Sequence, residues 1–138
     1  MTRSVVAIAG RELGSMFRTP VGWVVTALYA RPAVKVFDTA GVFQYGFAAH
    51  DIAKADLSFP SGVTIIDNIE GGSSIWITDG LRQTLKVYDD SGEFLALVGG
   101  YGYGPGEFRY PNDIVAVGDS SYLVLERVGN RIQHCLIR

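Results

Sequence analysis

The sequence predicts an all-β fold made of repeated four-stranded antiparallel sheets. Residues 35–43 return as residues 86–94, and the same offset of 51 residues places 59–66 onto 110–117. A second offset of 47 residues relates 75–79 to 122–126 and continues through 83–86 onto 130–133, with a shorter loop between them. Self-similarity with a period of this size is typical of stacked supersecondary units.

Each unit is predicted to hold four short strands, because runs rich in Val, Ile, Phe, Tyr and Trp are bounded by Gly, Asp, Asn and Ser. In the complete unit we expect the strands at 62–66, 75–79, 84–89 and 94–98. The strand segments do not alternate apolar with polar residues, which indicates that both faces of the sheet are covered. Asp-x-x-Gly steps at Asp38 and Asp89 suit the hairpin turn between the third and fourth strands.

Four antiparallel strands per unit, buried on both faces, are typical of a propeller blade packed between neighbouring blades. The predicted fold is a partial β-propeller of about two to two and a half blades, because the chain holds two strands in 34–47, a full blade in 59–98 and three strands in 113–137. Propellers close with about four to eight blades. We therefore expect the chain to be a propeller fragment or to self-associate.

The last unit resembles the NHL repeat of six-bladed β-propellers. Residues 104–114 read Gly-Pro-Gly-Glu-Phe-Arg-Tyr-Pro-Asn-Asp-Ile, the strand at 122–126 ends in Glu, and residues 129–133 read Gly-Asn-Arg-Ile-Gln. The NHL pattern is G-x-F-x-x-P-x-x-I/V, a strand ending in an acidic residue, then N-x-R-I-Q. The resemblance covers about residues 34–138, departs from the pattern at 57–59 and 82–85, and implies that Arg131 helps to hold adjacent blades.

The N-terminal segment differs from the rest of the chain. Residues 1–31 carry a net charge of +3 and the remaining residues −5, which together give the −2 of the whole chain. We predict two parts, an amphipathic and apolar helical segment at 1–30, with its helix at 5–17, and an NHL-like propeller fragment at 31–138. The uncharged stretch between Arg18 and Arg31 is too short to span a membrane as a helix, at about 18 Å against roughly 30 Å.

Several interpretations of this segment stay open. Residues 5–25 resemble the start of an ABC-type transporter permease, in which R-E-L and F-x-x-P steps lead into an apolar span. A basic start followed by an apolar stretch also fits a secretory signal cleaved after Ala30. A helix packed on the propeller or lying on a membrane surface, or two unrelated pieces joined, are further alternatives. We expect an extracytoplasmic or membrane-associated bacterial protein.

No motif for a metal or cofactor stands out in the sequence. His50 and His134 are the two histidines, whereas a zinc site needs three or four converging ligands. The glycine-rich stretch 99–106 contains no G-x-G-x-x-G and no following Gly-Lys-Ser/Thr, so it is predicted to be a connection between blades. The single Cys135 is expected to be a small buried thiol. We predict no metal and no cofactor.

Charged and polar residues recur near strand ends. Asp79 and Glu126 end equivalent strands, and each precedes a turn with a basic residue. They are candidate ligand-binding residues on one rim, or carboxylates that accept hydrogen bonds from turn N–H groups. The candidate set is Asp79, Arg82, Asn112, Asp113, Glu126, Arg127 and Arg131, and no catalytic residue is assigned. The aromatic residues Tyr101, Tyr103, Phe108 and Tyr110 are expected to pack locally rather than to stack on a ligand.

The predicted function is a non-enzymatic ligand- or protein-binding or scaffold module, because no acid, base and nucleophile converge in the repeats. The alternatives are a propeller hydrolase or lyase fragment with Asn112 and Asp113 near a central channel, or an accessory piece of a membrane transporter. Expected partners are a protein, a small molecule or a carbohydrate, with peripheral membrane contact through 1–30 and self-association. The net negative charge of the repeats disfavours nucleic acid.

Overall fold

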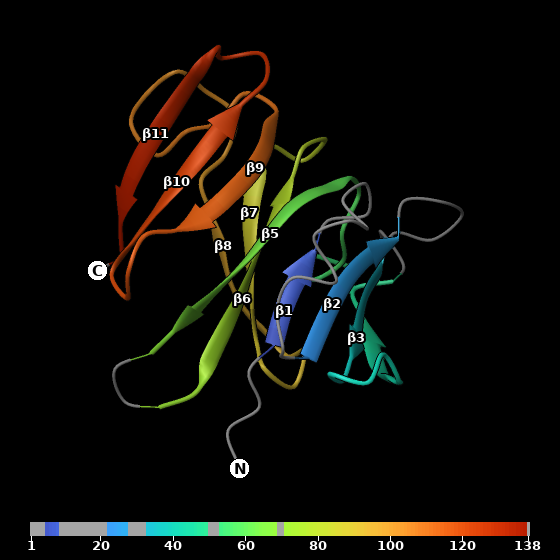
Figure 1. Ribbon diagram of the computed structural model, residues 1–138. Helices are drawn as coiled ribbons and strands as arrows, with labels where there is room; N and C mark the ends of the chain where they lie inside the picture. Colours follow the sequence, from blue (N-terminus) through green and yellow to red (C-terminus); the bar gives the residue numbers. More distant parts are fainter. Residues whose placement is uncertain (1–4, 9–21, 28–32, 50–52, 69–70, 138) are drawn as a thin grey trace.

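The regular secondary structure of the described residues consists of β-strands. The computed structural model describes residues 5–8, 22–27, 33–49, 53–68 and 71–137 (Figure 1). Within these ranges the strands are β1 (Val5–Ile8), β2 (Gly22–Ala27), β3 (Ala33–Phe37), β4 (Phe43–Phe47), β5 (Pro60–Asp67), β6 (Ser73–Asp79), β7 (Thr84–Asp89), β8 (Phe94–Val98), β9 (Pro111–Ala116), β10 (Ser121–Glu126) and β11 (Arg131–Leu136). The predicted all-β class is confirmed.

The strands form three sheets in chain order. The first sheet has the order β1-β2-β3-β4, the middle sheet β5-β6-β7-β8, and the last sheet β9-β10-β11. All neighbours in the middle and last sheets are antiparallel. The four strands expected at 62–66, 75–79, 84–89 and 94–98 lie within β5 to β8, so the predicted complete blade is confirmed.

The N-terminal segment departs from the prediction. Where a helix was expected, Val5–Ile8 and Gly22–Ala27 are strands that complete the first sheet. β1 runs parallel to β2, and β2 runs antiparallel to β3 across the expected boundary between residues 30 and 31. Runs rich in valine favour an extended backbone when a sheet edge such as β3 is there to pair with. Residues 9–21 and 28–32, with the rest of the expected helix and the suggested cleavage point, lie outside the described residues.

No helix in the described ranges is long and apolar enough to cross a membrane.

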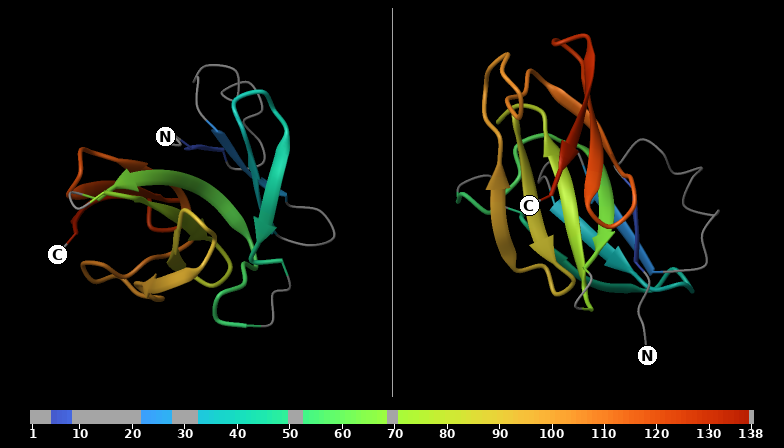
Figure 2. Two further views of the ribbon diagram at one scale, coloured as in Figure 1. Left: turned by 90° about the horizontal axis from the view of Figure 1, so that it is seen from below. Right: turned by 90° about the vertical axis from the view of Figure 1, so that its left-hand side faces the viewer.

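The sheets stack with the middle sheet between the other two (Figures 1 and 2). β5 lies next to β9 and also contacts β1, so the first strands of the three sheets follow one another as the inner strands of neighbouring blades do in a propeller. β5 and β9 approach closely at Gly62, where a Cβ atom would lie 2.6 Å from the Asp113 Cα. Only glycine allows this approach, because a side chain would push the two inner strands apart.

Both faces of the middle sheet are buried, as the lack of alternation predicted. On one face, Ile75, Ile77 and Tyr88 pack with residues of the first sheet such as Val34. On the other face, the core shared with the last sheet contains Ile66, Trp76, Leu85, Val87, Phe108, Ile114, Tyr122 and Val124. The hydrophobic core therefore consists of two layers, one on each side of the middle sheet.

Backbone geometry repeats with the same register as the sequence. Asp38 Oδ1 accepts hydrogen bonds of 2.9 Å from the N–H groups of the second and fourth residues after it, and Asp89 Oδ1 does the same. The glycines that follow, Gly41 and Gly92, have φ angles of 80° and 90°. These contacts confirm the turn predicted for the Asp-x-x-Gly step, in which glycine adopts positive φ without a steric penalty.

Candidate functional site

The end of β6 is held by a buried carboxylate. Asp79 accepts hydrogen bonds from the backbone N–H groups of Ser58 at 2.9 Å and Phe59 at 3.0 Å, just before β5. Its Oδ2 also lies 3.3 Å from the Lys86 Nζ, and both side chains are 0% exposed. These hydrogen bonds to Asp79 connect the segment that leads into β5 with the end of β6.

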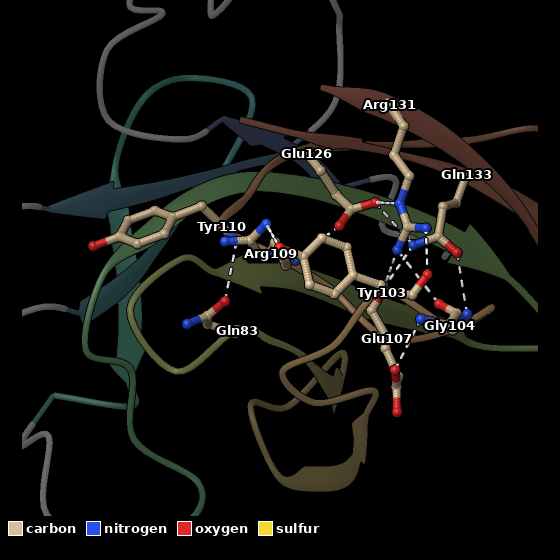
Figure 3. A network of polar contacts seen from close by, with 10 residues as sticks. Gln83, Tyr103, Gly104, Glu107, Arg109, Tyr110, Glu126, Arg131 and Gln133 are labelled. Atoms are coloured by element: carbon tan, nitrogen blue, oxygen red, sulfur yellow. Dashed lines mark hydrogen bonds and ion pairs between the residues drawn. The ribbon is translucent and has the colours of Figure 1, made fainter. Parts of the chain in front are cut away.

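Glu126 makes the equivalent contact in the last sheet. Its Oε1 accepts a 2.7 Å hydrogen bond from the Arg109 N–H, and its Oε2 accepts from the Arg131 Nε and, at 2.9 Å, from the Gln133 Nε2 (Figure 3). By the repeat register, Arg109 corresponds to Ser58 and Gln133 to Lys86. Burial by itself would raise the pKa of Glu126, but the hydrogen bonds from Arg131, Arg109 and Gln133 hold this pKa below its ordinary value.

Arg131 also joins the last sheet to the glycine-rich connection from the middle sheet. Its guanidinium donates to the carbonyl groups of Tyr103 at 2.7 Å and Glu107 at 2.9 Å, as Figure 3 shows. The planar guanidinium donates in several directions at once, which suits it to fastening a loop of backbone carbonyls. The role that the repeat pattern implies for this arginine agrees with these contacts.

The predicted site residues gather at one end of the sheets. β10 pairs with β9 so that Glu126 lies opposite Pro111, and β6 pairs with β5 so that Asp79 lies opposite Pro60. The ends of the second strands and the starts of the first strands therefore share one rim, which also carries the turns between the second and third strands. This rim carries Asp79, Arg82, Asn112, Asp113, Glu126, Arg127 and Arg131.

Within this set, solvent access differs. Arg82, Asn112, Asp113 and Arg127 are exposed, whereas Asp79 and Glu126 are buried. The Arg82 Nε donates to the Ser58 Oγ at 2.5 Å, and the Asp113 Oδ1 accepts from the Ile114 N–H at 2.9 Å. The buried carboxylates of Asp79 and Glu126 make internal hydrogen bonds. The exposed members of the set stay predicted ligand-binding residues.

A cluster of aromatic and cationic side chains lies at the edge of this rim. Tyr101 and Tyr103 are 65% and 67% exposed. The Arg109 guanidinium carbon lies 4.3 Å from the ring centroid of Tyr103 and 5.8 Å from that of Tyr101, and its Nη1 donates to the Tyr103 hydroxyl. We call these three residues the Tyr-Arg cluster.

The aromatic residues of this connection differ in solvent access. Phe108 is buried in the core, whereas Tyr101 and Tyr103 contact Arg109 locally and remain exposed. Their neighbours Gly100, Gly102 and Gly104 have no side chains to cover the rings. The alternation of tyrosine with glycine is the sequence signal that could have identified this exposed surface.

The Arg109 side chain has unused hydrogen-bonding capacity. Among the described residues, no carboxylate pairs with its guanidinium, and its Nε is a buried atom without a hydrogen-bond partner. Most buried donors in proteins have a hydrogen-bond acceptor, so the Arg109 Nε is an exception. Stacking on Tyr103 keeps the guanidinium oriented at the edge of the rim.

The described ranges contain no group of three or more His, Cys, Asp or Glu side chains placed to hold a metal ion. His50 lies outside these ranges, and His134 is exposed on β11 opposite Leu123. Cys135 is half-buried beside Tyr122, and burial raises the pKa of its thiol above the ordinary value.

The antiparallel four-stranded middle sheet, packed between two further sheets and with its first strand next to β9, is the arrangement of a partial β-propeller. A family model described as "6-bladed beta-propeller" matches residues 62–132, just over half of the 138-residue chain. The chain therefore belongs to this six-bladed β-propeller family. No curated protein matches the sequence.

Proposed function

We propose that the chain is a non-enzymatic binding module built from NHL-type propeller blades, and that it binds its ligand through the Tyr-Arg cluster. The observation that carries this proposal is the pair of exposed tyrosine rings beside an arginine that has no carboxylate partner among the described residues. Exposed aromatic faces pack on sugar rings or apolar side chains, and a guanidinium binds carboxylates with a fixed fork of donors. The ligand is accordingly an acidic carbohydrate or a carboxylate-bearing peptide segment.

The buried carboxylates support a binding role rather than acid–base chemistry. Asp79 and Glu126 accept hydrogen bonds from backbone N–H groups and from Lys86 or Arg131. For Glu126, these hydrogen bonds hold the pKa of the carboxyl group below its ordinary value, which opposes the proton transfer that a general acid needs. Their recurrence at equivalent repeat positions is what a structural role predicts.

The test uses arrays of neutral and acidic oligosaccharides and of peptides with free or amidated carboxyl termini. We expect the unmodified chain to prefer carboxylate-bearing probes. The double variant Tyr101→Ala/Tyr103→Ala and the single variant Arg109→Ala are expected to lose about tenfold or more of the affinity, as is typical when a residue that the bound ligand covers is truncated. Arg109→Lys keeps the charge but loses the fork, so an intermediate loss is expected.

Leu95→Ala is the matched control, because Leu95 is also an exposed large side chain but lies on β8, away from the cluster. Equal binding by the control and the cluster variants would contradict the proposed site. Failure to bind any acidic probe in preference to its neutral counterpart would contradict the proposed ligand class.

A further inference from the structure

The last sheet carries two arginines at positions where the middle sheet has none. By the repeat register, Arg109 corresponds to Ser58 and Arg127 corresponds to Gly80. The Ser58 and Arg109 N–H groups each donate to the carboxylate at the end of the second strand of their own sheet, at 2.9 Å and 2.7 Å. Because serine makes this backbone contact as well as arginine does, the fold does not require a cationic side chain at position 109.

The turn after the second strand repeats in the same way. The Gly80 N–H donates to the Phe59 carbonyl oxygen at 2.9 Å, and the Arg127 N–H donates to the Tyr110 carbonyl oxygen at 2.9 Å. Since glycine makes this contact in the middle sheet, it does not need the side chain of Arg127. Arg127 is exposed, and among the described residues no carboxylate pairs with its guanidinium. Its guanidinium is therefore available to a ligand.

The two arginines extend from neighbouring backbone segments of the rim. The Arg109 carbonyl oxygen accepts a 3.3 Å hydrogen bond from the Val128 N–H, next to the bond between Arg127 and Tyr110. Tyr110 has a φ of 55°, whereas the equivalent Phe59 does not adopt positive φ. A bulky residue at positive φ is uncommon and costs free energy, and such residues gather at functional sites. The backbone of the last sheet thus departs from the repeat at the point where the two arginines meet.

The glycine-rich connection beside the arginines favours a sugar over a peptide as the ligand. A Cβ atom at Gly100 would meet nothing within 4 Å, so the exposed rings of Tyr101 and Tyr103 stand on an open surface. A peptide that adds as a strand needs free backbone donors and pockets for its side chains. Backbone N–H groups of this connection already donate within the chain at Gly102, Gly104, Gly106, Glu107 and Phe108. Sugar rings that pack on exposed aromatic faces need neither.

We propose that the Tyr-Arg cluster and Arg127 form one extended site for an oligosaccharide of uronic acids, which carries a carboxylate on each sugar ring. This inference rests on the proposed function and names its ligand class. One carboxylate binds Arg109 and a second binds Arg127, while the sugar rings pack on the tyrosine rings. Once the first carboxylate is bound, the second contact is intramolecular, so an oligomer gains affinity over a single acidic sugar.

Isothermal titration calorimetry of the full chain with galacturonic acid and with its short oligomers tests the proposal. We expect the oligomers to bind about tenfold or more tightly than the single sugar. Arg127→Gly, which installs the residue of the equivalent turn in the middle sheet, should remove this gain and leave the binding of the single sugar unchanged. Arg109→Ser should weaken the binding of both. Lys35→Gln removes an exposed cation from β3 and is the charge-matched control, which should change neither.

Neutral oligosaccharides of the same length and glutamate peptides of the same charge complete the series of probes. Circular dichroism checks that each variant is folded, and Arg127→Gln replaces Arg127→Gly if the glycine variant is not. The inference is overturned if the oligomers bind no more tightly than the single sugar, if the Arg127 variant keeps the gain, or if the glutamate peptides bind more tightly than the acidic oligosaccharides. Each of these results leaves the proposed function standing. Loss of every preference for acidic over neutral probes would contradict the proposed ligand class and this inference with it.

Discussion

The middle and last sheets are formed by two copies of the same sequence repeat, but their surroundings differ. Leu85 in the middle sheet is 0% exposed, and the equivalent Ile132 in the last sheet is 65% exposed. Both positions carry large aliphatic residues, so the sequence pattern is the same at each. The difference shows that the burial of a strand face in this fold depends on the neighbouring sheet and not on the strand itself.

The carboxylates at the strand ends show a second difference between these sheets. In the middle sheet Asp79 faces a lysine that is fully buried, whereas in the last sheet Glu126 faces an arginine that keeps about a third of its side-chain surface in solvent. A charge with access to water can be rehydrated when its partner is lost, and a buried one cannot. The two contacts therefore have the same architecture but different energetic consequences.

The largest expected effect is that of Asp79→Ala. The substitution removes the carboxylate beside a buried ammonium group and the acceptor for two backbone N–H groups, so we expect a loss of about 3–5 kcal/mol in the free energy of unfolding. Glu126→Ala should cost less, about 1–3 kcal/mol, because Arg131 can turn to solvent. Urea titration of both variants measures the difference.

The double variant Asp79→Ala/Lys86→Met is the control for this interpretation. Replacing the buried ammonium group by an apolar side chain should recover part of the stability that Asp79→Ala loses. Equal losses for Asp79→Ala and Glu126→Ala, or no recovery in the double variant, would contradict the distinction between the two sheets.

The second prediction compares equivalent positions on the two sheets directly. Leu85→Ala creates a cavity between the middle and last sheets and should cost about 2–5 kcal/mol. Ile132→Ala should change the stability of the monomer by no more than about 0.5 kcal/mol, because its side chain is already exposed. Thermal melts at the lowest usable concentration keep self-association out of the comparison, and a large effect at Ile132 under these conditions would show that its face is covered within one chain.

The third and smallest effect concerns the connection between the two sheets. Gly99 has a φ of +79°, and a Cβ atom there would lie 2.3 Å from the Cε2 of the buried Phe108. Gly99→Ala should therefore cost about 1–3 kcal/mol through overpacking and an unfavourable backbone conformation. The adjacent Gly100 has nothing within 4 Å of its Cβ position, so Gly100→Ala is the matched control in the same melts. A loss of similar size in both variants would point to a general intolerance of the loop to side chains.

Much of the fold could be predicted from local patterns. The strands of the middle sheet, the Asp-x-x-Gly turns and the alternative role of Asp79 and Glu126 as hydrogen-bond acceptors are confirmed. Each depends on residues close together in the sequence or on the repeat register. The helix expected in residues 5–17 is wrong for Val5–Ile8, because an amphipathic pattern of apolar residues does not reveal that β2 is available for pairing.

The candidate site was predicted less completely. The seven polar residues do share one rim, but the exposure of Tyr101 and Tyr103 and their contact with Arg109 depend on how the connection of residues 99–106 lies over the last sheet. Nothing in the sequence identifies Arg109 as a site residue, because it is a single charged residue between two aromatic residues. Its role follows from the position of its guanidinium over the Tyr103 ring.

The sequence by itself determined the repeat, the number and direction of strands in the complete blade, and the turn chemistry, because these depend on backbone preferences of short contiguous segments. Only the tertiary structure decided that β1 and β2 pair into the first sheet and that Ile132 is exposed where the equivalent Leu85 is buried. Strand pairing and burial depend on contacts between residues far apart in the chain, and equivalent residues such as Leu85 and Ile132 therefore meet different surroundings.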